Sequence, residues 1–231
     1  MKFSQLISET IRKRQTLILL FSGLIFVGFV LLAIRPFIHT EKSFLFLFWN
    51  LFLALIPLVL SSVMMQMKNL QYSRMSIISV GFIWLIFFPN APYVLTDFIH
   101  LSYGSFRHFW LDAMTITWFA VASLLSAIIS LNDISLLLGT AWKKQNTSLA
   151  ILAISLLSGF GIYLGRYLRF NSWDVLHNPG SLINEMTDRV INPFDHPRTW
   201  MVTVGFGLLL FFVFKGIRFM ANEMQVKQIE R

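Results

Sequence analysis

Long apolar runs separated by short polar segments dominate the chain. Each run approaches the ~20 residues that an α-helix needs to cross the hydrocarbon core of a membrane. The runs predict transmembrane helices at about residues 17–34, 44–65, 76–95, 109–131, 147–168 and 199–219. The pattern therefore predicts an all-α fold, a polytopic bundle of about six transmembrane helices in a single integral membrane domain over residues 1–231.

The third run is irregular, because two prolines interrupt it at Pro89-Asn90-Ala91-Pro92. It either continues through the prolines to about Leu95 or breaks at Pro89. Proline removes a backbone N–H donor, and irregular backbone at membrane depth is tolerated where it packs inside protein or lines a cavity. This stretch is therefore the first place to look for a functional site.

The connection between the fifth and sixth runs carries a shorter pattern. Apolar residues recur there at helical spacing, with polar residues filling the other positions, at Leu182, Ile183, Met186 and Val190. This amphipathic pattern predicts a short helix at about residues 181–191, lying on the membrane surface.

Composition supports lipid as the solvent of this protein. The chain is 56% hydrophobic and 13% charged, with a mean hydropathy of +0.67, whereas a soluble domain carries about 25% charged residues. The net charge of +8 raises the question of nucleic acid. However, the basic residues flank the apolar runs, so we expect membrane lipids as partners and no nucleic acid, with protein partners unknown. The chain has no Cys, which excludes disulfide and thiolate chemistry.

The distribution of basic residues predicts the orientation. With the N-terminus placed inside, twelve of the 19 Lys and Arg residues fall in cytoplasmic segments. Positively charged residues favour the cytoplasmic side, so we expect both termini to be cytoplasmic.

Acid–imidazole pairs gather on the predicted outer face. They are Asp97–His100, Asp174–His177 and Asp195–His196. Residues three apart share a helix face, and a carboxylate with an imidazole can form a general acid–base pair or ligate a metal. A divalent metal is therefore a possible cofactor, with candidate ligands Asp97, His100, Asp174, His177 and His196. The alternative is that Asp97 caps or pairs locally while His100 lies at the headgroup level.

The end of the fifth predicted helix supplies candidate anion contacts. Arg166 and Arg169 share one helix face, and the planar guanidinium suits phosphate or carboxylate. The alternative is that these side chains snorkel to the interface. One turn earlier, Gly161 and Gly165 form a G-x-x-x-G face that predicts a close helix–helix contact.

Two segments of the chain carry a resemblance. They read Phe-Pro-Asn-Ala-Pro-Tyr at 88–93, followed by Thr-Asp and His-Leu, and Gly-Arg-Tyr-Leu-Arg-Phe-Asn-Ser-Trp-Asp at 165–174. Both segments resemble the signatures of an uncharacterised bacterial membrane family, domain of unknown function 1361. The resemblance covers most of the chain from about the second helix onward. It implies a multi-pass protein of the bacterial plasma membrane, and it brings no activity with it. The family pattern includes Asn90, Pro92, Asp97, His100, Arg166, Asn171 and Asp174.

Three functions remain open. The first is an enzyme of the outer leaflet that acts on a lipid or lipid-linked anionic substrate. Asp97, His100 and Asp174 would be its catalytic residues, and substrate would be bound by Asn90, Arg166, Arg169 and Asn171. The second is a non-catalytic scaffold or accessory subunit in cell-envelope assembly, and the third is a transporter. For the enzyme we expect the two signature segments to meet in one cavity at the outer surface, whereas a transporter needs a polar path across the membrane.

Overall fold

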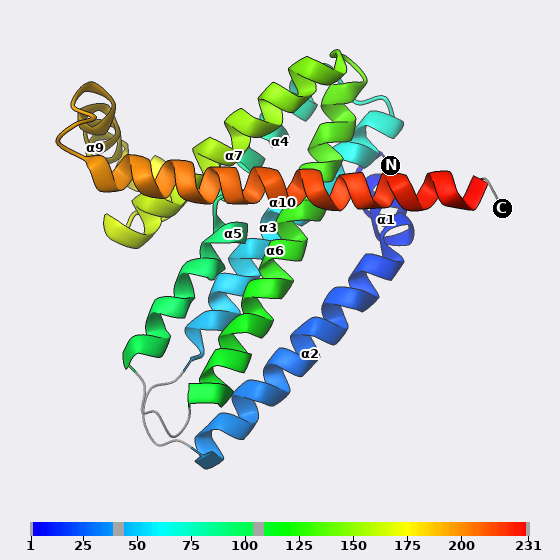
Figure 1. Cartoon of the computed structure of the whole chain (residues 1–231). Helices are drawn as coiled ribbons and strands as arrows, with labels where there is room; N and C mark the ends of the chain where they lie inside the picture. The colour runs from blue at the N-terminus through cyan, green and yellow to red at the C-terminus, as the bar shows by residue number, and fades with distance from the viewer. Residues whose placement is uncertain (1, 39–43, 104–108, 230–231) are drawn as a thin grey trace. The chain divides into compact units, whose positions relative to one another are not determined.

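The computed structural model describes residues 2–38, 44–103 and 109–229, and these residues form helices joined by turns (Figure 1). The helices are α1 (Lys2–Lys13), α2 (Gln15–Ile38), α3 (Phe46–Asn69), α4 (Arg74–Phe87), α5 (Asn90–Tyr93), the 3₁₀ helix η1 (Val94–Tyr103), α6 (Phe109–Gly139), α7 (Lys144–Tyr167), α8 (Asp174–His177), α9 (Pro179–Ile191) and α10 (Pro197–Ile229). Six spans are long and apolar enough to cross a membrane. The predicted all-α bundle with six transmembrane helices is therefore confirmed.

Large apolar side chains are exposed along the spans. Phe26, Phe82 and Phe212 are 68%, 63% and 64% exposed. Such side chains would be costly in water, and lipid is the solvent that accepts them.

The chain divides into two compact units, unit 1 (Met1–Asp133) and unit 2 (Ile134–Arg231), and α6 runs through the boundary. In unit 1, α3 contacts α1, α4, α5 and η1. The start of α3, the end of η1 and the start of α6 come together at one end of this unit (Figure 1).

Side-chain hydrogen bonds join α3 to α6 close to Pro57, which lies inside α3. Pro57 lacks a backbone N–H, which weakens the helical hydrogen bonding around it. The Ser126 hydroxyl donates to the Ala54 carbonyl at 2.8 Å, and the Ser130 hydroxyl donates to the Pro57 carbonyl at 3.0 Å. Trp84 of α4 in turn donates its indole N–H to the Ser130 oxygen at 2.7 Å. These buried serines therefore serve helix packing, which is the usual use of small polar residues between membrane helices.

The third span continues through its two prolines. Its apolar length runs from Arg74 to Leu101, with α-helix giving way to short α5 and then to η1. The Asn90 side-chain amide donates to the Phe87 carbonyl at 2.9 Å, which supplies a donor at the irregular turn. Phe88 is fully buried and stacks on Trp84 with ring centroids 4.6 Å apart. The irregular backbone is thus packed inside protein, as membrane depth requires.

The fourth span is longer than the pattern predicted, because α6 continues past residue 131 to Gly139. The polar pair Asn132-Asp133 marked the end of the apolar run in the sequence. Asp133 is nevertheless buried, since Arg14 donates to its carboxylate at 2.6 Å and the Ser61 hydroxyl donates at 3.0 Å. Partners from the turn between α1 and α2 and from α3 allow an acid to stay inside this span.

In unit 2, α7 and α10 pack closely along one another. Their backbones approach closely at Gly159 and Gly207: a Cβ built on Gly159 would lie 2.3 Å from the Thr203 carbonyl oxygen. Gly161 and Gly165 are half-buried, and their close contact stays a prediction. After α7 the chain forms α8 and then α9, which begins with Pro179 in its first turn, where a missing N–H is harmless.

Candidate functional site

Asp97 lies inside unit 1, although it follows the irregular part of the third span. Its side chain is only 1% exposed, and the Asn50 side-chain amide of α3 donates to its Oδ2 at 2.9 Å. The 3₁₀ helix η1 carries Asp97, and the Thr96 hydroxyl donates to the Tyr93 carbonyl at 2.7 Å within the same segment. A buried carboxylate is expensive without such contacts, so its position is strongly determined by the fold.

His100 sits beside this carboxylate, one turn further along η1. Its Nε2 is 4.0 Å from Asp97 Oδ1, and its side chain is 36% exposed. The ring also packs on Phe46 of α3, with centroids 4.8 Å apart. One face of the imidazole is therefore held by protein while the rest reaches the surface of unit 1.

This arrangement suits proton transfer. A buried carboxylate next to an imidazole stabilises the imidazolium form, and the exposed part of the ring can exchange a proton with a bound molecule. The distance of 4.0 Å between His100 Nε2 and Asp97 Oδ1 is longer than a hydrogen bond. However, acid–base contacts in ligand-free sites often shorten when substrate binds.

Asp174 and Asn171 lie in the second signature segment, in unit 2, where they contact each other. The Asp174 carboxylate accepts a hydrogen bond from the Asn171 backbone N–H at 2.6 Å. His177 lies at the end of α8, and its Nδ1 is 3.1 Å from the Trp173 carbonyl. These contacts shape the turn that leads into α8.

The expectation that Arg166 and Arg169 share one helix face is wrong, because α7 ends at Tyr167, between the two residues. Arg166 is half-buried in the last turn, whereas Arg169 adopts a left-handed backbone with φ of 61°. A non-glycine residue rarely takes this conformation, although it is common at the position that ends a helix. The Phe170 N–H bonds back to the Leu164 carbonyl at 3.1 Å and closes the helix end. Arg169 therefore directs the chain from α7 into the Asn171–Asp174 turn.

His196 pairs with an acid other than its sequence neighbour. Its Nε2 is 2.7 Å from Asp188 Oδ2, and the Asn192 side-chain amide donates to Asp188 Oδ1 at 2.8 Å. The hydrogen bonds from Asn192 and His196 lower the pKa of the Asp188 carboxyl below its usual value. Asp188 lies in the last turn of α9 and Asn192 directly follows that helix, so their i to i+4 spacing explains the Asn192 contact. The sequence suggested Asp195 as the partner of His196 instead.

Arg189 is a buried cation that the sequence pattern did not single out. Its side chain is 8% exposed, it pairs with Glu185 one turn earlier on α9, and its guanidinium lies 5.7 Å from the centre of the Tyr163 ring. Burial lowers the pKa of Arg189, but Tyr163 and Glu185 favour the charged form more strongly, so the pKa lies above its ordinary value. The i to i+4 spacing from Glu185 was the available signal.

Asp133 of unit 1 is a buried acid that the sequence pattern did not single out, and its partners are Arg14 and Ser61. Arg14 is 24% exposed and Asp133 is 3% exposed, so this is a partly buried ion pair. The signal in the sequence was an acid within reach of an apolar run, which needs a partner at membrane depth.

The predicted site residues fall in both units. Asp97, His100 and Asn90 belong to unit 1, whereas the other candidates belong to unit 2. The meeting of the two signature segments in one cavity therefore stays a prediction. Within the described residues, no three His, Cys, Asp or Glu side chains lie close enough together to hold a metal ion.

One known protein family matches the chain. The model of the family described as "Protein of unknown function (DUF1361)" covers residues 49–213, from the start of α3 into α10. No curated protein and no solved structure gives a significant match.

Proposed function

The chain belongs to this family of unknown function, and on that premise we propose that it is a membrane enzyme acting on a lipid or lipid-linked anionic substrate. The proposed location is the outer face of the bacterial plasma membrane, and the distribution of basic residues supports an outward-facing η1. Asp97 and His100 are the proposed acid–base pair, with Asp174 as a further acid. The proposed substrate contacts are Asn90, Arg166, Arg169 and Asn171.

The burial of Asp97 against Asn50 carries this proposal. A carboxylate needed only for solubility would lie at the surface, whereas this one is held inside the protein by an amide from another helix. Strongly positioned titratable groups of this kind concentrate at functional sites. The side chain of His100 is 36% exposed, so a bound molecule can reach the imidazole that lies beside Asp97.

In the proposed reaction His100 takes a proton from the attacking group and returns it to the leaving group. Asp97 stabilises the imidazolium that forms in between, and Asn50 keeps the carboxylate in place. Asp97 and His100 supply one oxygen and one nitrogen ligand, whereas a catalytic Zn²⁺ site normally has three protein ligands, so we assign no step of the reaction to a metal.

The test compares lipid extracts from cells that lack the gene and carry either the parent protein or a variant. Asp97→Asn keeps an oxygen that can accept from Asn50 and removes the charge, so we expect folded protein in the membrane without activity. Asp195→Asn is the matched control, because Asp195 is exposed on the same predicted face. We expect a lipid or lipid-linked species to accumulate with Asp97→Asn and not with Asp195→Asn.

Two outcomes would decide against the enzyme. One outcome is an unchanged lipid profile in cells that carry folded Asp97→Asn protein but show a defect in the cell envelope. This outcome would favour the scaffold. Loss of the folded protein itself would identify Asp97 as a structural residue. Metal analysis of the purified parent and Asp97→Asn proteins tests the metal separately.

The proposed orientation has its own test. The natural chain has no Cys, so single Cys residues can be introduced at Ser181 and Asn146, which are both exposed. An impermeant thiol reagent applied to whole cells should label position 181 and spare position 146. The reverse pattern would invert the topology and place Asp97 on the cytoplasmic side.

A further inference from the structure

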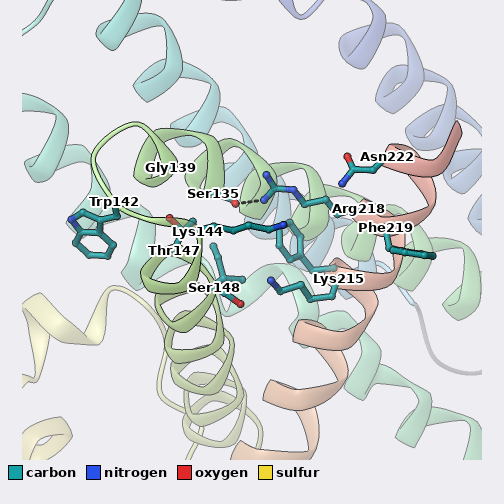
Figure 2. Close-up of a pocket in the computed structure, with 12 residues that line it drawn as sticks. Ser135, Gly139, Trp142, Lys144, Thr147, Ser148, Lys215, Arg218, Phe219 and Asn222 are labelled. Carbon is teal, nitrogen blue, oxygen red and sulfur yellow. Dashed lines mark hydrogen bonds between the residues drawn. The ribbon is translucent and has the colours of Figure 1, made fainter. Parts of the chain in front are cut away.

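A basic pocket opens in unit 2, where the turn joining α6 to α7 faces the C-terminal part of α10 (Figure 2). Its volume is about 490 Å³. The lining residues are Ser135, Gly139, Trp142, Lys144, Thr147, Ser148, Ile151, Phe214, Lys215, Arg218, Phe219 and Asn222. Three of these are cations, several others are hydroxyl or amide side chains, and none is an acid.

The three cations converge from two helices. Lys144 is the first residue of α7, whereas Lys215 and Arg218 are three apart on α10 and therefore share a face. Figure 2 shows their charged ends turned toward one another across the pocket. Lys215 is close enough to Arg218 and Lys144 to be repelled by their charges. This repulsion is relieved most simply by an anion placed among the three groups.

Arg218 and Lys215 are held in place more firmly than ordinary surface cations. The Arg218 guanidinium donates a hydrogen bond to the buried Ser135 hydroxyl and lies 6.0 Å from the Phe214 ring centre. The Lys215 ammonium lies 5.4 Å from the Phe211 ring centre. Both side chains are half-buried. Ordinary positive residues at a cytoplasmic membrane surface are mobile and solvated, so the positive-inside rule alone does not account for this arrangement.

The start of α7 adds to the positive potential of the pocket. Lys143 occupies the N-cap position with no side-chain cap, and Thr147 and Ser148 of the first turns line the pocket. Uncapped N–H groups at a helix start favour negative charge.

We propose that this pocket binds a negatively charged phosphate group. The hydroxyl and amide donors beside the three cations suit phosphate oxygens, for which Arg and Lys are the standard partners. At the mouth, Trp142 and Phe219 are 49% and 65% exposed. Exposed aromatic side chains beside cations are typical of the headgroup region of a membrane, so an anionic phospholipid is the source that fits best. A soluble phosphate offers the same chemistry without the acyl chains.

The test titrates the purified full-length protein in detergent. The probes are short-chain phosphatidylglycerol, short-chain phosphatidylcholine and inorganic phosphate, and Trp fluorescence reports binding. Trp142→Phe, which removes the indole at the mouth, assigns the signal to the pocket. We expect phosphatidylglycerol to bind and phosphatidylcholine to give no saturable change.

The critical variant is Lys215→Gln with Arg218→Gln. Its control is Arg12→Gln with Lys13→Gln, which removes the same charge from exposed positions outside the pocket. The pocket variant removes two cations that can donate hydrogen bonds to the phosphate, so we expect it to bind phosphatidylglycerol at least about tenfold more weakly than the control.

Saturable binding of inorganic phosphate that competes with the lipid would assign the site to soluble phosphates as well. Failure of both anionic probes to bind better than phosphatidylcholine would overturn the proposal. Equal binding by the pocket and control variants would overturn it too, because attraction would then depend on net charge alone. None of these outcomes involves Asp97, so the enzyme proposal stands or falls separately.

Discussion

A methyl group added to Gly159 should separate α7 from α10. A Cβ at this position would lie 2.3 Å from the Thr203 carbonyl oxygen and 3.0 Å from the Gly207 nitrogen. Both are backbone atoms, so no side-chain rotation can relieve the contact. A carbon and a carbonyl oxygen normally approach no closer than about 3.3 Å, which leaves a deficit of about 1 Å for the helices to absorb.

The expected cost follows from this deficit. A gap of 0.5–1 Å forfeits roughly a quarter to a half of the dispersion attraction between facing atoms, and overpacking in well-packed cores costs about 1–3 kcal/mol. Gly205 is the matched control, because a Cβ there would meet nothing within 4 Å. Since both substitutions add the same methyl to a helix, the change in helix propensity cancels. We expect Gly159→Ala to be less stable than Gly205→Ala by about 1–3 kcal/mol.

Equilibrium unfolding in mild detergent with increasing dodecyl sulfate measures this difference. Gly207→Ala should resemble Gly159→Ala, because its Cβ would lie 2.8 Å from the Leu156 Cα. Equal midpoints for the Gly159 and Gly205 variants would refute the reasoning, since α7 and α10 would then have room between them.

Two other predictions concern charged groups. Asp133→Asn should destabilise the protein by about 1–3 kcal/mol, because it leaves Arg14 without its anionic partner in a partly buried site; a double-mutant cycle with Arg14→Gln should show strong coupling, and additive effects would contradict the pairing. The lowered pKa of Asp188 means that its interactions stabilise the protein above the unfolded pKa and are lost as the pH falls through the folded pKa. Melting temperatures of the parent and Asn192→Ala should therefore differ at neutral pH and converge as the pH falls below about 4, and a constant difference across this range would show that Asn192 does not act through the carboxylate.

Local hydrophobicity was sufficient to identify the membrane spans. A span needs only a long apolar run, and burial in lipid does not depend on which helix lies next to it. For the same reason the short amphipathic helix α9 was visible as a periodic pattern, and it runs from Pro179 to Ile191. The sequence alone was misleading where a contact with a distant residue stabilises a polar side chain inside a span. The apolar pattern ended the fourth span at 131, whereas the contact with Arg14 lets Asp133 remain inside α6.

The candidate site also has features that the local sequence predicts and features that only tertiary packing determines. Asp97 and His100 were predicted from their place in an apolar run that two prolines interrupt, because ionisable residues are rare in such a setting. The hydrogen bond between Asn50 and Asp97 depends on tertiary packing, since Asn50 lies 47 residues earlier and reaches Asp97 only when α3 packs against η1. Similarly, the sequence did not indicate the backbone contact at Gly159 and Gly207, which lies outside the G-x-x-x-G face of Gly161 and Gly165. Helix contacts depend on the rotation and crossing of two helices, which arise from packing summed over many side chains, whereas a span is determined by the residues within it.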